Sequence, residues 1–140
     1  MKICIGSDHR GFELKQVIIE ELPEIEWIDV GTHNDKRTDY PLFAEKVCKN
    51  ILSGKSEFGV LICGSGIGMS IAANRHKKIY AGLCWSESVA KAAKEDDNIN
   101  ILVLPASFVG PEQAVLMIKD WLSSKFKGGH YQQRLELIDR

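Results

Sequence analysis

A cysteine stands directly before a glycine-rich turn near the middle of the chain. Residues 58–74 read FGVLICGSGIGMSIAAN, so that Cys63 ends an apolar run and Gly64, Gly66 and Gly68 follow it. Glycines leave backbone N–H groups open to a ligand, and such groups at the start of a helix bind phosphate, carboxylate or a developing oxyanion. The positive end of a helix also lowers the pKa of a nearby thiol. The segment therefore predicts an anion site with an acidified Cys63 as its base or nucleophile.

The spacing of these glycines disfavours the common nucleotide-binding loops. Gly-x-Gly-x-Gly is one residue shorter than the dinucleotide fingerprint, and it follows what we expect to be the third strand rather than the first. The Gly-Lys-Ser/Thr of phosphate-binding loops is absent. We therefore expect neither a nicotinamide nor an ATP site, and no cofactor.

The other cysteines show no spacing that would bind a metal or form a disulfide framework. Cys4, Cys48 and Cys84 are scattered and form no C-x-x-C pair with each other or with Cys63. We interpret these three as small core side chains, two on strands and one on a helix, and expect no metal.

Composition limits the class of protein. The 140 residues are 44% hydrophobic and 26% charged, with 18 Lys and Arg against 19 Asp and Glu. This size suits one domain over residues 1–140. No basic stripe predicts nucleic-acid binding, no apolar stretch reaches membrane-spanning length, and the first apolar run is too short for a signal peptide. We expect a cytoplasmic protein without nucleic-acid or membrane partners.

Apolar runs alternate with amphipathic stretches along the chain. Runs such as Val60-Leu61-Ile62 are apolar on both faces, which is typical of parallel strands covered by helices. We predict strands near 2–6, 26–30, 58–63, 79–84 and 100–104, and helices near 11–22, 41–53, 67–76, 87–96, 111–125 and 131–138. The predicted class is α/β, a three-layer Rossmann-like fold with a five-stranded parallel sheet.

In such sheets ligands bind beyond the carboxyl ends of the strands. The first strand ends in Ser7-Asp8-His9-Arg10, and the first and third strands are commonly neighbours, so Asp8 and His9 should lie beside Cys63. The polar segment 31–39 is either a solvated connection or a cover for this site.

Four separated motifs resemble one family of enzymes. They read SDHRG at 7–11, TDYP at 38–41, CGSGIGMSIAAN at 63–74 and GGHYQQR at 128–134. Together they look like the ribose-5-phosphate isomerase type B family, which also includes galactose-6-phosphate and allose-6-phosphate isomerases. The motifs occur in the family's order over almost the whole chain.

The resemblance implies a metal-free aldose–ketose isomerase that interconverts ribose 5-phosphate and ribulose 5-phosphate through an enediolate. It also implies a homodimer or homotetramer in which two subunits share each site; three tryptophans, Trp27, Trp85 and Trp121, favour an interface as well. By the resemblance Cys63 moves the proton between C2 and C1, and Ser65 helps to position it. The candidate substrate-binding residues are Asp8, His9, Arg10, Tyr40, Gly64, Gly66, Ile67, Gly68, Asp97, His130 and Arg134.

Several of these candidates also have a plainer interpretation. Asp8 and His9 are residue types common in surface turns. Tyr40 could be a core aromatic with a satisfied hydroxyl or, as the resemblance implies, a hydroxyl that contacts the sugar, and the two interpretations are compatible. Arg10 stands where the family often has a small or apolar residue, and it either adds charge for a phosphate or is simply solvated.

The chain departs from the family where ring opening is expected. Asp96-Asp97 replaces a His-Asn pair. A carboxyl group shuttles protons if burial or a neighbouring acid raises its pKa, so Asp96 is the candidate for opening the sugar ring and Asp97 the second choice. Both are otherwise solvated acids at a helix end.

The chain also departs from the family in its arginines. Ser107 and His130 stand where the family has arginine, and only Arg134 keeps its guanidinium. A hydroxyl and an imidazole do not reproduce the bidentate bonds of arginine to phosphate. His9 and Arg10 are candidates to compensate.

Two other functions stay open at this stage. The same chemistry on a six-carbon sugar phosphate differs only in pocket length, and a non-catalytic sugar-phosphate-binding subunit would keep the fold without turnover. A phosphoacceptor signalling domain is disfavoured, because Leu104-Pro105 stands where such a domain has a lysine.

Overall fold

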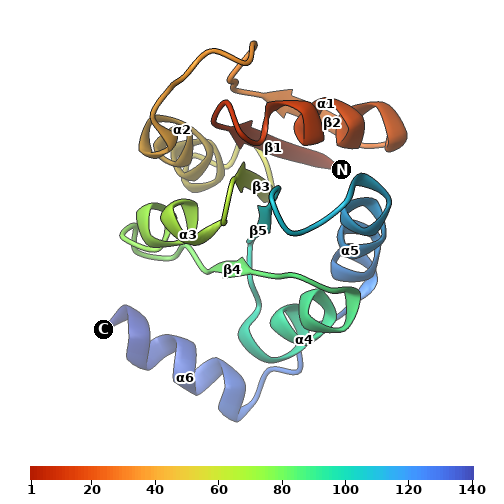
Figure 1. The fold of residues 1–140 in the computed structure, drawn as a ribbon. Coiled ribbons are helices and arrows are strands. Elements are labelled where there is room, and N and C mark those ends of the chain that lie inside the picture. The colour runs from red at the N-terminus through yellow and green to blue at the C-terminus, as the bar shows by residue number, and fades with distance from the viewer.

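Each strand of the structure is followed by a helix that returns across the sheet, and the strands all run in parallel. The computed structural model describes residues 1–140. The strands are β1 (Lys2–Ser7), β2 (Glu26–Asp29), β3 (Phe58–Cys63), β4 (Ala81–Leu83) and β5 (Ile101–Pro105); the helices are α1 (Phe12–Glu21), α2 (Tyr40–Leu52), α3 (Ile67–Ala73), α4 (Glu87–Asp97), α5 (Pro111–Ser123) and α6 (His130–Asp139). The sheet order is β2-β1-β3-β5-β4 (Figure 1). The predicted fold class is confirmed, as is the pairing of the first strand with the third.

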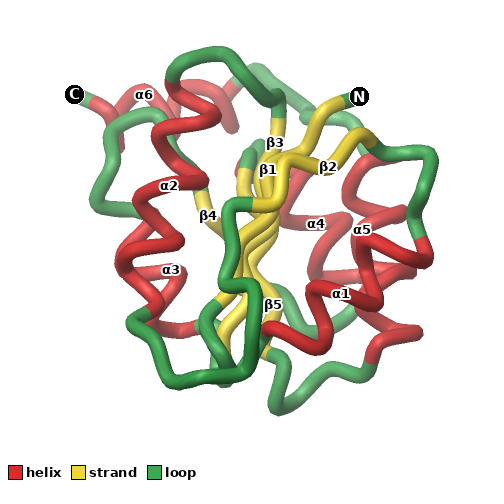
Figure 2. Tube along the Cα trace, turned by 90° about the horizontal axis from the view of Figure 1, so that it is seen from above, coloured by secondary structure: helices red, strands yellow, loops and turns green.

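Helices cover both faces of the sheet. Figure 2 shows α2 and α3 on one side of the strands and α1, α4 and α5 on the other. Side chains alternate accordingly along β1: Ile3 and Ile5 pack with Trp121 in one core cluster, whereas Cys4 packs with Val47 in the other. The three layers of the prediction are therefore present.

Local sequence explains most of the helix boundaries. Pro41 and Pro111 lie in the first turns of α2 and α5, where a missing N–H costs nothing. Ser86 caps α4 by accepting the Val89 N–H at 3.3 Å, and Asn98 ends that helix in the left-handed conformation.

Two predicted elements are three residues longer than the observed ones, which is the largest excess in the chain. β4 covers only 81–83 of the predicted 79–84, because Lys78 turns the chain with a positive φ and leaves Ile79 and Tyr80 outside the strand. Cys84 consequently lies one residue beyond the strand, although it is buried as expected. α3 ends at Ala73 rather than near 76.

The last helix stands apart from the two helical layers, beside the short edge strand β4 (Figure 1). Asp139 holds the C-terminal end of this helix in place. Its carboxylate accepts hydrogen bonds from the Tyr80 hydroxyl and, at 3.3 Å, from the Lys78 N–H. It also lies 3.4 Å from the Lys78 Nζ. α6 is thus tied by its last turn to the segment that leads into β4.

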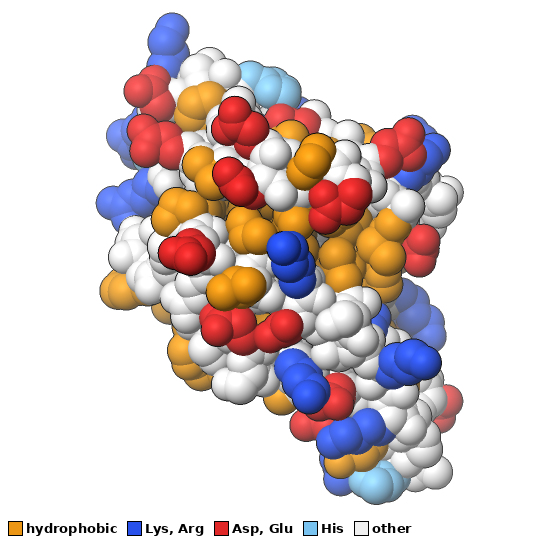
Figure 3. Space-filling model, turned by 90° about the vertical axis from the view of Figure 1, so that its right-hand side faces the viewer, with side chains coloured by type: hydrophobic (Ala, Val, Ile, Leu, Met, Phe, Trp, Pro, Cys, Tyr) orange, Lys and Arg blue, Asp and Glu red, His pale blue; other side chains and the backbone are white.

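The surface mixes both signs of charge. Over α1, α4 and α5, acidic and basic side chains are interspersed with apolar ones (Figure 3). Of the three tryptophans, Trp121 is fully buried, Trp27 is half-buried and Trp85 is 60% exposed. No helix combines the length and apolar character that crossing a membrane would require.

Candidate active site

The carboxyl ends of β1 and β3 lie side by side. The Asp8 N–H donates to the carbonyl of Ile62, the residue before Cys63, at 3.2 Å. Asp8 is buried, and its Oδ1 accepts the N–H groups of Arg10 and Gly11 at 2.9 and 3.2 Å. The Asp8 side chain therefore shapes the turn after β1 and holds a carboxylate at the same sheet edge as the thiol.

The environment of Cys63 raises rather than lowers its pKa. Burial is the largest cause, and the charge of Asp8 adds to it, whereas hydrogen bonds from the backbone of Met69, Gly66 and Ser65 act in the opposite direction. The expected acidified thiol is wrong for the unliganded chain, because desolvation outweighs the backbone groups of a helix only seven residues long. The resting side chain is a neutral thiol near pH 7.

The glycine-rich turn leads straight from Cys63 into α3. Gly66 adopts a φ of +76°, and a Cβ there would lie 2.5 Å from the Leu83 Cδ1. Ser65 stabilises the turn because its Oγ accepts the Ile67 N–H at 3.2 Å. The conformation therefore requires glycine at 66 and is tightened by the serine before it.

Tyr40 lies against the first turn of α3. A Cβ on Gly68 would lie 2.5 Å from the Tyr40 Cζ, so the phenol ring occupies the place of a side chain at 68. Tyr40 is 37% exposed. It therefore belongs to the rim of the Cys63 edge and not to the core, and its contact with a sugar stays a prediction.

His9 is held in a defined orientation by the polar segment 31–39. The Thr38 N–H donates to His9 Nδ1 at 3.3 Å, so Nδ1 is the acceptor and the neutral ring carries its proton on Nε2. The start of the segment is tied down as well, because the Ser7 N–H donates to the Gly31 carbonyl at 2.7 Å. Both ends of the segment therefore adjoin the end of β1 and the turn after it, while residues 33–37 between them are exposed.

Asp96 and Asp97 lie at the opposite end of the strands from Cys63, where the strands begin. They end α4, and β5 starts shortly afterwards at Ile101, whereas Pro105 at the far end of β5 pairs with Cys63. A strand of five residues spans roughly 16 Å. Within one chain neither acid reaches the thiol.

Asp96 is part of a charged and aromatic group with the start of α6. Lys127 Nζ lies 2.7 Å from Asp96 Oδ1, and this hydrogen bond raises the pKa of Lys127. Lys127 and Arg134 stand 5.1 and 5.2 Å from the centre of the Tyr131 ring, on which His130 stacks at 4.5 Å. We call Asp96, Lys127, His130, Tyr131 and Arg134 the Asp96 cluster.

The predicted site residues thus fall into two groups. One group lies at what we call the Cys63 edge: Asp8, His9, Arg10, Tyr40, Cys63, Gly64, Ser65, Gly66, Ile67 and Gly68. The other lies at the opposite edge: Asp96, Asp97, His130 and Arg134.

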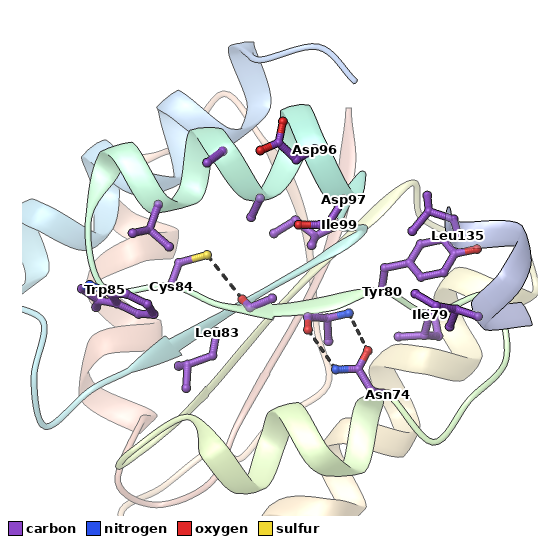
Figure 4. Close-up of a pocket in the computed structure, with 16 residues that line it drawn as sticks. Asn74, Ile79, Tyr80, Leu83, Cys84, Trp85, Asp96, Asp97, Ile99 and Leu135 are labelled. Carbon is purple, nitrogen blue, oxygen red and sulfur yellow. Dashed lines mark hydrogen bonds between the residues drawn. The ribbon is translucent and has the colours of Figure 1, made fainter. Parts of the chain in front are cut away.

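An apolar groove runs along β4 and reaches the two acids. It is lined by α4, β4 and α6, with Tyr80, Leu83, Trp85 and Leu135 among its side chains and Asp96 and Asp97 at one end (Figure 4). Asn74 covers the free edge of the strand, since its amide accepts the Ala81 N–H at 2.8 Å and donates to the Ala81 carbonyl at 2.9 Å. The groove is therefore suited to side-chain packing and not to the addition of a strand.

One buried ion pair was missed by the sequence analysis. Lys15 is fully buried on α1 and lies 2.7 Å from the Asp29 carboxylate, which also accepts the Gly31 N–H at 2.9 Å. The pair therefore supports the start of segment 31–39. The available signal was a lysine between Leu14 and Ile18, on the apolar face of its helix.

The fold and the Cys63 edge define a class of protein. It is a Rossmann-like α/β protein in which a cysteine lies beside a carboxylate and before a glycine-rich turn. Residues 3–138 match the family model described as Ribose/Galactose Isomerase. The chain belongs to the ribose/galactose isomerase family. No group of three or more His, Cys, Asp or Glu side chains is placed to hold a metal ion.

Individual relatives are similar over more than nine tenths of their lengths. Ribose-5-phosphate isomerase B of Escherichia coli strain K12 is 40% identical over 139 residues, which cover 98% of this chain and 93% of that protein. A crystal structure of a ribose 5-phosphate isomerase from Thermotoga maritima is 45% identical and superposes with a TM-score of 0.97 over 99% of this chain and 97% of that one. The Mycoplasma genitalium ribose-5-phosphate isomerase B with bound ribulose-5-phosphate is 37% identical, with a TM-score of 0.93 over 99% and 94% of the two chains.

Proposed function

We propose that this protein is a ribose-5-phosphate isomerase that interconverts ribose 5-phosphate and ribulose 5-phosphate through an enediolate. The observation that carries the proposal is the placement of Cys63 beside Asp8 and before the Gly64–Gly68 turn, in a chain of this family. Proton abstraction next to a carbonyl requires a base and a stabilised oxyanion, and this edge offers one of each.

In the proposed reaction the open-chain aldose binds with C1 and C2 at Cys63. The thiolate takes the C2 proton, and the electrons of that C–H bond form the C1–C2 double bond while the aldehyde oxygen becomes an oxyanion. The thiol then returns the proton to C1, and the proton of the C2 hydroxyl passes to O1, which leaves a ketone at C2. Backbone N–H groups aimed at the oxyanion contribute about 3 kcal/mol to such a step.

The thiolate has to form in the complex, because the resting group is a thiol. Asp8 disfavours the thiolate through its charge. We propose that sugar hydroxyl groups donate to the Asp8 carboxylate and thereby offset that charge when substrate is bound. Asp8 then has two roles, as a substrate ligand and as the group that couples binding to thiol ionisation.

The second half of the proposed site comes from another copy of the chain. The Asp96 cluster is too far from Cys63 within one chain, and exposed Trp85 with the apolar groove along β4 supplies surface for packing against a second copy. We propose a homodimer, at minimum, in which Asp96, Asp97, His130 and Arg134 of one subunit face the Cys63 edge of the other.

Subunit complementation tests this arrangement. The variant Cys63→Ala and the double variant Asp96→Asn/Arg134→Ala each damage one half of every site. Co-refolded together, they form mixed dimers with one intact site, and a statistical mixture should recover about a quarter of wild-type turnover. No recovery in a mixture shown to contain mixed dimers would place both halves in one subunit. A protein that is monomeric by light scattering and still fully active would contradict the dimer itself.

A substrate series tests the reaction. Turnover should be fastest on ribose 5-phosphate and much slower on allose 6-phosphate and galactose 6-phosphate. Preference for a six-carbon substrate would show that the protein catalyses the same isomerisation on a six-carbon sugar phosphate. Saturable binding of all three without turnover would make it a non-catalytic binding subunit.

A further inference from the structure

We propose that Arg10 is the phosphate-binding residue that the Cys63 edge itself supplies. This inference rests on the proposed sugar-phosphate substrate and names the side chain that meets the phosphate charge. The evidence is the position of the guanidinium, its lack of an ionic partner and the hydrogen bond that already occupies one nitrogen of the neighbouring histidine.

The Arg10 side chain lies across the glycine that follows Cys63. A Cβ built on Gly64 would lie 2.8 Å from Arg10 Cδ and 2.9 Å from Arg10 Nη1, and 3.4 Å from the Ser107 Oγ. The guanidinium of the β1 turn and the hydroxyl that follows β5 therefore meet above Gly64. The absence of a side chain at 64 makes room for this contact.

No carboxylate neutralises this guanidinium. None of the ion pairs in the structure involves Arg10, and its side chain is exposed. Asp8, the nearest acid in sequence, directs Oδ1 to the backbone N–H groups of Arg10 and Gly11. An unpaired guanidinium next to the proposed base is free to form charge-assisted, bidentate bonds to a phosphate.

The other groups nearby offer single hydrogen bonds. His9 accepts the Thr38 N–H on Nδ1, which leaves Nε2 as the ring nitrogen available to a ligand. Ser107 offers its hydroxyl, because its backbone N–H already donates to the Gly64 carbonyl at 2.9 Å. Among His9, Arg10 and Ser107, only Arg10 carries a guanidinium, the group that forms charge-assisted, bidentate bonds to a phosphate.

The contribution should be to substrate binding and not to the proton transfer. Arg10→Gln keeps a polar side chain of similar reach but removes the charge, and we expect it to raise the KM for ribose 5-phosphate about 10- to 100-fold with less than about a 3-fold change in kcat. The inhibition constant of inorganic phosphate, used as a competitor, should rise by a similar factor. Arg10→Lys should recover only part of the loss, because an ammonium group lacks the bidentate geometry.

Arg75→Gln is the matched control, since Arg75 is an exposed arginine beyond the far end of α3. It should leave KM and phosphate inhibition unchanged. An Arg10→Gln variant with wild-type KM and wild-type phosphate inhibition would overturn the proposal, as would a fall in kcat at constant KM.

A double-mutant cycle tests the contact itself. Gly64→Ala places a methyl group where the Arg10 side chain lies, so it should raise KM in the wild-type background and should do so less in an Arg10→Ala background. Equal effects in the two backgrounds would show that Arg10 does not lie over Gly64 when substrate binds.

Failure of the proposed function would leave a different pattern. If the wild-type protein does not isomerise ribose 5-phosphate, the binding of inorganic phosphate is followed by ³¹P NMR titration of the wild type and of Arg10→Gln. Weaker phosphate binding by the variant then still supports the anion site. Equal binding refutes it, whatever the substrate proves to be.

Discussion

Burial raises the pKa of the Cys63 thiol, and the carboxylate of Asp8 at the end of the neighbouring strand raises it further. The two residues therefore oppose the ionisation that the proposed chemistry needs, and the backbone groups of the glycine-rich turn only partly offset them. The thiol is therefore neutral in the unliganded chain, and burial contributes more to this than the charge of Asp8 does.

This relationship predicts how alkylation of Cys63 depends on pH. Only the thiolate reacts with iodoacetamide, so the rate should rise with pH and reach half its maximum above the ordinary pKa of a cysteine. Asp8→Asn removes one cause of the raised pKa and should shift the curve to lower pH. Burial remains the largest cause, so the shift should be partial.

The other three cysteines are internal controls for that experiment. Burial raises the pKa of Cys4, Cys48 and Cys84 to about 12. Between pH 7 and 10, mass spectrometry should therefore find the label on Cys63 before the others. An unchanged curve in Asp8→Asn would disprove the coupling between the two residues.

Steady-state kinetics should show the same coupling with substrate present. The profile of kcat/KM reports the free enzyme and should rise through an apparent pKa above the ordinary thiol value. The profile of kcat reports the complex and should rise at lower pH, because substrate hydroxyls offset the Asp8 charge. Identical profiles would exclude Asp8 from that role.

Removal of the thiol should abolish catalysis without damaging the fold. We expect Cys63→Ala to lower kcat about 10²- to 10⁴-fold, the usual range for a general base, with an unchanged circular dichroism spectrum. Cys48→Ala is the buried control; it should keep its activity and lose about 1 kcal/mol in the free energy of unfolding. Near-normal turnover in Cys63→Ala would refute the assignment.

The sequence predicted the sheet and the Cys63 edge because both follow from local patterns. Apolar runs identified β1, β3 and β5, and the turn residues that follow them had to gather where parallel strands end. The acidified thiol was a local argument too, and it failed because burial of Cys63 depends on packing that the glycine motif does not reveal.

Contacts between residues far apart in the sequence could not be predicted either, because they also depend on how the elements pack. Lys15 and Asp29 become an ion pair only when the β1-α1-β2 unit closes, so the position of the lysine on an apolar face did not indicate its partner. Asp96 was assigned by its place in a motif, and only the topology shows that β5 separates it from Cys63 in one chain.

The Asp139 contacts predict how the last helix depends on pH. The hydrogen bond from Tyr80, and then the backbone N–H and charge of Lys78, lower the pKa of Asp139. A lowered carboxyl pKa stabilises the fold above the ordinary value and loses this effect as pH falls through the lowered one, below about pH 4. Burial and Asp139 raise the pKa of Tyr80 to about 12, so its hydroxyl stays a donor at neutral pH.

Asp139→Asn should therefore loosen α6 at neutral pH, with amide exchange in residues 130–139 faster by about 10-fold. KM should rise as well, because His130 and Arg134 are carried on this helix. Glu136→Gln on the same helix, an exposed acid, is the control and should change neither. Exchange in Asp139→Asn at the wild-type rate would show that other contacts hold the helix.

The prediction that departs furthest from the family concerns Asp96. Opening of the ribose ring requires a base for the anomeric hydroxyl proton and an acid for the ring oxygen. Asp96 Oδ1 lies 2.7 Å from Lys127 Nζ, and in the proposed opening the Asp96 carboxylate accepts the first proton and returns it to the ring oxygen. Ribulose 5-phosphate cannot form such a ring and needs no opening.

Asp96→Asn should therefore separate two rates. Exchange of solvent protons at C1 of ribulose 5-phosphate, followed by NMR in deuterated water, should stay near the wild-type rate, while net conversion of ribose 5-phosphate falls about 10- to 100-fold. Asp97→Asn is the neighbouring control and should affect both rates less. If exchange and conversion fall together in Asp96→Asn, or neither falls, Asp96 does not open the ring, and its carboxylate serves only to hold Lys127 and the start of α6.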